Sequence, residues 1–165
     1  MATIPCTEGM VVEGGSDDGI TYPSVTSCMT ITCLLDGGAK VGAHDAIFQR
    51  VQPQVFMALK GKIGKRTVQK VRAAGSGSSW TPRMTSQVQL SEDFAKNDKT
   101  WASKKWSDQL AAMESFLISR NEEQFRRMLA WQFAVDLADV TFNKFDEGNI
   151  EILDDGTLLL NGVKA

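Results

Sequence analysis

The chain is poor in the residues that build metal centres and disulfide frameworks. Among its 165 residues there are one histidine and three cysteines. An odd number of cysteines, with no sequence typical of a secretory signal, argues against a framework of disulfides. Lysine and arginine number 18 against 20 aspartates and glutamates, which gives a net charge of −2. This balance lacks the basic excess that is typical of surfaces binding nucleic acid or acidic membranes.

Long apolar runs are also missing. No stretch approaches the length that spans a bilayer, and the first residues show no cationic segment followed by an apolar run. We therefore expect a protein without a membrane span that is cytoplasmic, or is exported by a specialised secretion system without a cleavable signal peptide. The length fits a single domain over 1–165 with its own apolar core. The oligomeric state is left open.

The first half of the chain indicates strands and one helix. Residues 1–23 are rich in glycine, aspartate and proline, and we expect loops around one short strand at Met10–Val12. Cys28–Leu35 is β-branched and apolar, which favours a strand. The turn signal Asp36-Gly37-Gly38 and the segment Lys40–Phe48 then predict a returning strand, so that the two form a β-hairpin.

A helix and a third strand are predicted next. Pro53 suits a first helical turn, and apolar residues follow it at helical spacing as far as Ile63, before Gly64. The segment Arg66–Ala74 predicts a strand that runs into the loop Gly75–Ser79.

The second half predicts two long helices and a terminal hairpin. The first helix would run from Asp98 to Arg120, and the second would begin at Asn121. The residues expected on the buried face of the second helix are Phe125, Met128, Leu129, Phe133, Leu137 and Val140. The hairpin would join Ile150–Leu153 to Thr157–Leu160. The predicted fold class is α+β, a layered domain whose mainly antiparallel sheet is packed by helices. Residues 90–165 would be a helical layer plus the hairpin, with the helices forming a rim that selects a protein substrate.

The candidate chemistry lies on the first hairpin, where Cys28 begins one strand and His44, the one histidine, lies on the other. Most cysteines are small buried hydrophobes, and Cys28 can be read in that way. The functional interpretation is a thiol nucleophile with an imidazole partner that takes its proton. Strand alternation places Cys33 with Met29 and Ile31, which predicts that Cys33 is the core cysteine.

The register of the hairpin decides whether the two groups can meet. A two-residue turn at Gly37-Gly38 would place Ile31 opposite His44, whereas a three-residue loop centred on Asp36 would place Cys28 directly across from it. The sequence leaves both registers open.

The pattern TSC–MTITCLLDGGAKVGAH resembles the thiol deamidase superfamily, which joins the chemotaxis-receptor deamidase CheD and the catalytic domain of cytotoxic necrotizing factor toxins. In that family a small residue precedes a catalytic cysteine, followed by a strand, a tight turn and a returning strand that ends in the catalytic histidine. Ser27-Cys28 and His44 match these features, and the helix and glycine-ended strand that follow are also similar. The resemblance covers about residues 20–80, the expected catalytic core.

The resemblance implies a glutamine deamidase that acts on a target protein and needs no cofactor and no metal. Cys28 would be the nucleophile and His44 the acid and base. The third catalytic position falls to Thr21, Ser24 or Thr26. Backbone N–H groups at Ser27 and Cys28 would hold the oxyanion, and the site rim would be formed by Gly75, Ser76 and Gly77.

Other functions are weighed beside this one. A thiol protease or a transglutaminase uses the same acyl-thioester chemistry. A non-catalytic interaction or structural protein would keep the fold and a buried cysteine. A zinc site made of Cys6, Cys28, Cys33 and His44 lacks a paired cysteine knuckle and is disfavoured.

Overall fold

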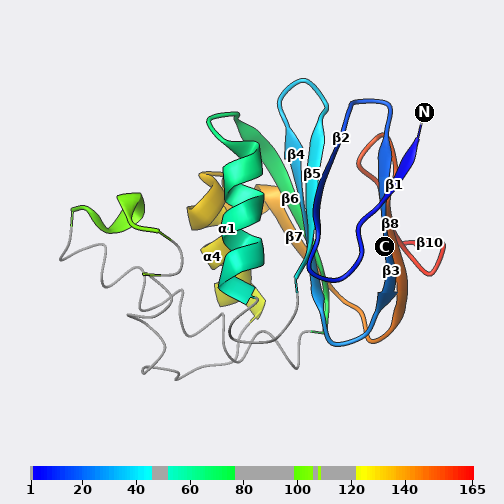
Figure 1. Ribbon diagram of the computed structural model, residues 1–165. Helices are drawn as coiled ribbons and strands as arrows, with labels where there is room; N and C mark the ends of the chain where they lie inside the picture. Colours follow the sequence, from blue (N-terminus) through cyan, green and yellow to red (C-terminus); the bar gives the residue numbers. More distant parts are fainter. Residues whose placement is uncertain (1, 46–51, 77–98, 106–107, 109–121) are drawn as a thin grey trace.

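The computed structural model of the chain describes residues 2–45, 52–76, 99–105, 108 and 122–165. In this part of the chain, two helices cover one face of a β-sheet, and a second sheet covers its other face (Figure 1). The architecture is therefore three layers, helix on sheet on sheet. The α+β class predicted from the sequence is confirmed, but the strands form two sheets instead of one.

Each sheet has five strands. The first sheet, here called sheet A, has the order β1-β3-β8-β9-β10, and the central sheet B has the order β2-β5-β4-β6-β7. Pairing is antiparallel except for β1 with β3 and β6 with β7. The strands are β1 Thr3–Pro5, β2 Val11–Gly14, β3 Gly19–Val25, β4 Met29–Leu35, β5 Lys40–Asp45, β6 Val68–Gly75, β7 Val140–Lys144, β8 Gly148–Ile152, β9 Leu158–Leu160 and β10 Val163–Lys164.

The N-terminal segment is more ordered than its composition indicated. It supplies three strands, β1, β2 and β3, where the sequence predicted one short strand among loops. Ile20 and Tyr22 alternate along β3, and Val25 joins them after a bulge; all three are buried between the two sheets, which favours an extended segment. Pro5 is tolerated because β1 lies at the edge of sheet A.

The first helix forms as predicted. Helix α1 spans Gln52–Ile63, and its buried side chains pack on sheet B. They are Val55, Phe56, Leu59 and Ile63. Gly64 follows with φ 63°, which is the left-handed conformation that glycine adopts readily at a helix end.

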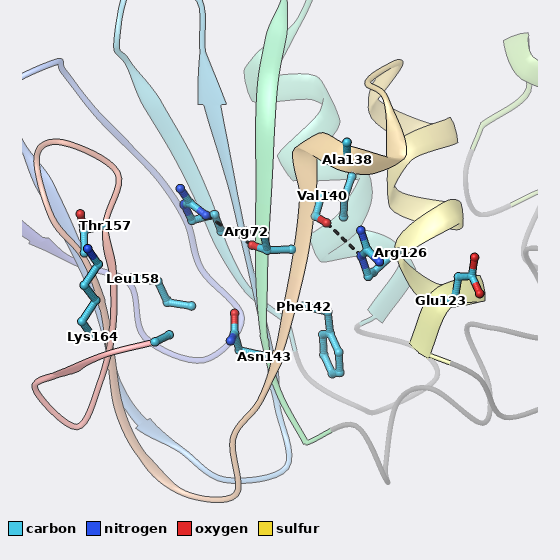
Figure 2. Close-up of a pocket in the computed structure, with 12 residues that line it drawn as sticks. Arg72, Glu123, Arg126, Ala138, Val140, Phe142, Asn143, Thr157, Leu158 and Lys164 are labelled. Carbon is cyan, nitrogen blue, oxygen red and sulfur yellow. Dashed lines mark hydrogen bonds between the residues drawn. The ribbon is translucent and has the colours of Figure 1, made fainter.

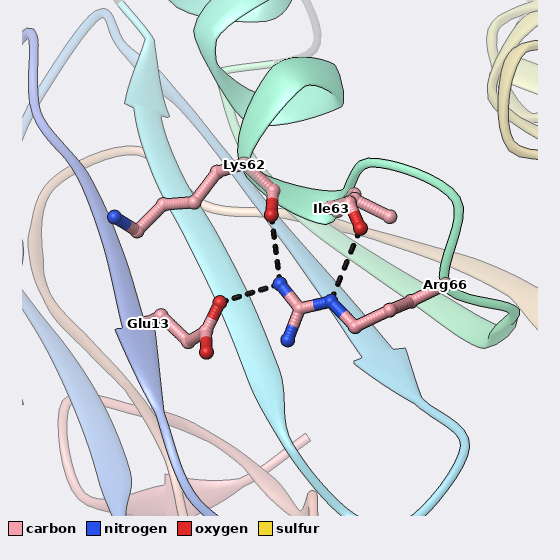
Figure 3. A network of polar contacts seen from close by, with 4 residues as sticks. All are labelled: Glu13, Lys62, Ile63 and Arg66. Carbon is pink, nitrogen blue, oxygen red and sulfur yellow. Dashed lines mark hydrogen bonds and ion pairs between the residues drawn. The ribbon is translucent and has the colours of Figure 1, made fainter.

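An ion-pair network ties the end of α1 to the edge of sheet B. The Arg66 guanidinium donates hydrogen bonds to the carbonyl oxygens of Ile63 at 3.1 Å and Lys62 at 2.7 Å, and it pairs with Glu13 at 2.5 Å (Figure 3). The arginine therefore satisfies carbonyls that the last helical turn leaves open. Because Glu13 lies on β2, the network also ties the end of α1 to this edge strand of the sheet.

The second of the two predicted C-terminal helices is shorter than predicted. Helix α4 spans Glu122–Phe133 and ends there, because Ala134 adopts φ 54° and the Val135 N–H bonds to the Ala130 carbonyl. Val140, assigned to the same helix from the sequence, instead begins β7. The helical spacing did identify buried residues, namely Phe125, Leu129, Phe133 and Val140, but it did not separate a helix from the strand after it.

The helix predicted from Asp98 to Arg120 falls mainly outside the described residues. Within 99–105 the chain forms a turn and a 3-10 helix at Trp101–Ser103, not the start of an α-helix. The terminal hairpin is confirmed as β8 and β9. No helix in the described ranges is long and apolar enough to cross a membrane.

Candidate functional site

The hairpin of β4 and β5 places Cys28 and His44 at the same end of sheet B. Cys28 directly precedes β4, and His44 is the next-to-last residue of β5. Thr30 is the cross-strand partner of His44. Extending the alternation of β4 back by one residue from Met29 puts Cys28 on the His44 side, as a diagonal neighbour at about 7–8 Å between backbones.

The register is neither of the two alternatives that the sequence left open. The loop has three residues, Asp36 to Gly38, and is closed by the Leu35 N–H bonding to the Ala39 carbonyl at 2.8 Å. The loop is centred on Gly37, not on Asp36. Relative to the loop centred on Asp36, this shift by one residue leaves His44 on the Cys28 face but moves its partner from Cys28 to Thr30.

The main chain before β2 holds the His44 ring. The ring Nδ1 lies 3.0 Å from the Cys6 carbonyl oxygen. The His44 N–H donates to the Met10 carbonyl at 3.1 Å, and the His44 carbonyl accepts from the Gly9 N–H at 2.8 Å. Tyr22 packs edge-on against the ring, with centroids 6.1 Å apart. The imidazole is 1% exposed, so its position is fixed on several sides.

These contacts determine which nitrogen of His44 carries the proton. A carbonyl oxygen can only accept, so Nδ1 must donate to Cys6. In the neutral ring Nε2 is then left with a lone pair. Nε2 is buried and has no hydrogen-bond partner among the described residues. His44 is thus a fixed imidazole with an available basic nitrogen, and its Nε2 is not hydrogen-bonded to Cys28.

Glu8 is a site residue that the sequence interpretation missed. It lies in a turn in which the Met10 N–H bonds to the Thr7 carbonyl at 2.9 Å. Gly9 adopts φ 84°, the conformation that a type II turn requires at its third residue. The Glu8 carboxylate is hydrogen-bonded to the Cys28 thiol and also acts electrostatically on His44. The Glu8-Gly9 pair was the one sequence signal here. It indicated a turn, but not that the turn lies beside Cys28 and His44.

Burial keeps the Cys28 thiol and the His44 imidazole neutral at neutral pH. It raises the pKa of the Cys28 thiol to about 12, and the nearby carboxylates of Glu8 and Asp45 act in the same direction. Burial also lowers the pKa of His44, against the opposing effects of the Cys6 carbonyl and Glu8. The resting pair at neutral pH is therefore a thiol and a neutral imidazole, not the thiolate and imidazolium of many thiol enzymes.

None of the three hydroxyl residues proposed for the third position is hydrogen-bonded to a His44 ring nitrogen. Thr21 is half-buried in β3, and its carbonyl accepts the Cys6 N–H at 2.8 Å. Ser24 is exposed, with φ 54° at a bulge in β3, and Thr26 is exposed in the bend that follows. The Cys6 carbonyl binds the ring in their place, and Thr21 holds Cys6 through the N–H of the same residue.

The remaining predicted residues surround Cys28. Ser27 is exposed in the bend before it. Gly75 ends β6 beside Met29, and the Cys28 carbonyl occupies the space that a Cβ at Gly75 would need. Any larger residue at Gly75 would therefore displace the Cys28 main chain. Ser76 is half-buried at the described end of this segment, and Gly77 lies outside the described residues.

The other two cysteines have different surroundings. Cys33 is fully buried in the core between sheet B and the helices, which confirms the sequence prediction. Cys6 is buried between the sheets and belongs to the same core as Tyr22. Cys28, 4% exposed, belongs to neither apolar cluster. All three are free thiols. Within the described part of the chain, no three His, Cys, Asp or Glu side chains are arranged to hold a metal ion.

Comparison of the chain with protein families and with curated proteins gives no match.

Proposed function

We propose that the chain is a cysteine-dependent amidohydrolase that converts a glutamine of a target protein to glutamate. The observation that carries the proposal is the His44 imidazole. Its Nδ1–H is bound to the Cys6 carbonyl, and its Nε2 is left free on the face of the sheet that Cys28 shares. A buried base of fixed tautomer on the same strand face as a thiol can take the thiol proton in nucleophilic acyl transfer once the two groups come within hydrogen-bond reach.

The reaction would proceed through a thioester. Cys28 Sγ attacks the carboxamide carbon as the thiol proton passes to His44 Nε2. The C–N bond then breaks, and the imidazolium returns the proton to the departing nitrogen, which leaves as ammonia. Water attacks the thioester, with His44 taking its proton, and the C–S bond breaks to give glutamate and the thiol. Backbone N–H groups at Ser27 and Cys28 would stabilise the oxyanion. No cofactor is needed.

The neutral resting pair is compatible with this mechanism. In serine hydrolases a neutral hydroxyl loses its proton to a neutral imidazole during attack, and a third group only orients the ring. Here the Cys6 carbonyl would orient the His44 ring. A thiol whose pKa is raised to about 12 gains more from such a base than one that is already ionised.

The choice of a protein glutamine rests on the resemblance of residues 20–80 to the thiol deamidases. The new negative charge would switch the target protein. The proposal places the chain in the cytoplasm or among exported effectors.

The test is ammonia release from an unfolded, glutamine-rich protein such as casein, with mass spectrometry to find glutamine converted to glutamate. Wild type and Cys33→Ala should convert glutamine, whereas Cys28→Ala and His44→Ala should not. Chain cleavage would instead indicate a thiol protease. Incorporation of an added amine at glutamine in preference to hydrolysis would indicate a transglutaminase. Equal, background-level ammonia release from all four proteins would contradict the proposal.

A second candidate is a non-catalytic interaction or structural protein. The observation that favours it is the environment of Cys28, which is 4% exposed and has a pKa raised to about 12, as in buried structural thiols. In that case Cys28→Ala would leave every biological readout of the chain intact, while folding would still depend on Cys33.

A further inference from the structure

A cleft of about 750 Å³ lies along the open edge of sheet B, away from Cys28 and His44. Strand β7 is the last strand of that sheet and forms the floor of the cleft. Thr157 and Lys164 line one side, and Arg126 and Glu123 of α4 line the other (Figure 2). The cleft at the β7 edge is therefore bordered by sheet A on one side and by helix α4 on the other.

The main chain of β7 has ladder positions that face this cleft. The Val140 carbonyl accepts from Arg126 Nε at 2.9 Å, and the Val140 N–H bonds to the Leu137 carbonyl, so both groups point away from β6. Strand alternation makes the N–H and C=O of Phe142 point the same way. Neither group of Phe142 has a hydrogen-bond partner among the described residues, whereas the Phe145 N–H turns back to Gly75 at 2.9 Å.

Positive charge lies on both sides of this edge. Arg72 comes from β6 and donates to the Gly156 carbonyl at 2.7 Å, which places it on the side of sheet A. Arg126 comes from α4 on the opposite side and is held by the Val140 and Leu137 carbonyls. Within the described chain, the hydrogen bonds of both guanidinium groups go to carbonyl or hydroxyl oxygens and none goes to a carboxylate. Lys164 is exposed on the sheet A side.

We propose that the β7 edge binds an extended, acidic segment of a partner protein as an added strand. Phe142 would supply the main-chain hydrogen bonds, as in other cases of strand addition. Successive side chains of an added strand point to opposite faces, and both faces hold a cation: Arg126, beside Glu123, on one, and Arg72 and Lys164 on the other. The cleft is lined by these three cations and one carboxylate, so glutamate or aspartate on the segment would meet a net positive charge, whereas a basic segment would be disfavoured. This inference does not depend on whether Cys28 is a nucleophile.

The test uses the full chain and a short fluorescent peptide of glutamate and valine, followed by fluorescence anisotropy. The acidic peptide should bind, and the same peptide with lysine for glutamate should not. Methylating alternate backbone nitrogens of the acidic peptide, which removes ladder donors, should weaken binding about tenfold. Lys164→Glu should weaken binding about fivefold at low salt, whereas Lys65→Glu, the same change on an exposed residue outside the cleft, should have no effect.

Several results would overturn the proposal. They are an acidic peptide that does not bind, acidic and basic peptides that bind alike, and equal effects of Lys164→Glu and Lys65→Glu. Unchanged binding of the methylated peptide would exclude strand addition. Inorganic phosphate that competes as well as the unlabelled peptide would reduce the cleft to a simple anion site and overturn the proposal as well.

Discussion

Replacing Gly42 with alanine is expected to disturb the contact between the two sheets beside His44. Gly42 lies on β5 two residues before His44, on the face that meets sheet A. A Cβ at this position would collide with the Tyr22 hydroxyl, which is itself hydrogen-bonded to Thr32 Oγ1 at 2.6 Å. The Tyr22 Cζ at 3.0 Å and the Ile20 Cδ1 at 3.1 Å leave little room for the new methyl group to shift.

The cost follows from these contacts. Overpacking a rigid core costs about 1–3 kcal/mol, and loss of the Tyr22–Thr32 hydrogen bond adds about 1 kcal/mol. Gly42→Ala should therefore lower the free energy of unfolding by about 2–4 kcal/mol in urea denaturation. The matched control is Gly61→Ala. A Cβ there, within α1, would meet nothing within 4 Å, so this change should stabilise by about 0.5–1 kcal/mol.

A double-mutant cycle tests the assigned cause. Tyr22→Phe removes the hydroxyl. Gly42→Ala should then cost only about 1 kcal/mol in that background, because two close contacts remain for the new methyl group. If Gly42→Ala costs as much with Phe at position 22 as with tyrosine, or no more than Gly61→Ala, the packing described here is wrong.

Three further predictions concern the site. Burial lowers the pKa of His44 below its ordinary 6.5, so below that pH the unfolded chain binds a proton at this histidine more readily than the folded chain does. The free energy of unfolding should therefore fall as the pH drops from 6.5 toward the folded pKa, and His44→Gln should flatten this pH profile, measured in urea between about pH 7 and 5. Glu8→Gln removes a carboxylate that raises the pKa of Cys28, so iodoacetamide should label Cys28 faster. Burial is the largest cause of the rise from 9.0 to about 12 and remains in the variant, so the gain should stay well below the roughly thousandfold that the whole rise would give; an unchanged rate in peptide maps would exclude the Glu8 contact. Cys33→Ala should cost about 1–2 kcal/mol in urea as a core truncation, and Cys28→Ala less than about 1 kcal/mol, and the reverse order would contradict the two assigned environments.

The sequence predicted the elements whose patterns are local. The hairpin of β4 and β5, helix α1, strand β6 and the terminal hairpin all carry apolar periodicity bounded by glycine turns. The failures came where a partner distant in sequence decides the structure. Strand β3 is extended because Tyr22 is covered by the other sheet, and Val140 is in a strand because it pairs with Val71 of β6. Apolar spacing marks burial in such cases but not the element.

The site was predictable in part for the same reason. The cysteine and the histidine were identified from the sequence of one hairpin, but their shared strand face was not, because the sequence left the register of that hairpin open. The contacts that define His44 come from a segment about 38 residues away in the chain, since Cys6 supplies a carbonyl that every residue type would offer. Glu8 reaches Cys28 only because its turn packs on the end of β5. No residue pattern encodes either contact.

The most direct test of the proposed chemistry is a search for the thioester on Cys28. Wild-type chain is mixed with the glutamine-rich substrate, quenched in acid within seconds and digested for mass spectrometry. The proposed mechanism predicts an acyl adduct on the Cys28 peptide that hydroxylamine removes, with no adduct on Cys6 or Cys33 and none in His44→Ala. Conversion of glutamine to glutamate that persists in Cys28→Ala, or an adduct on another cysteine, would contradict it.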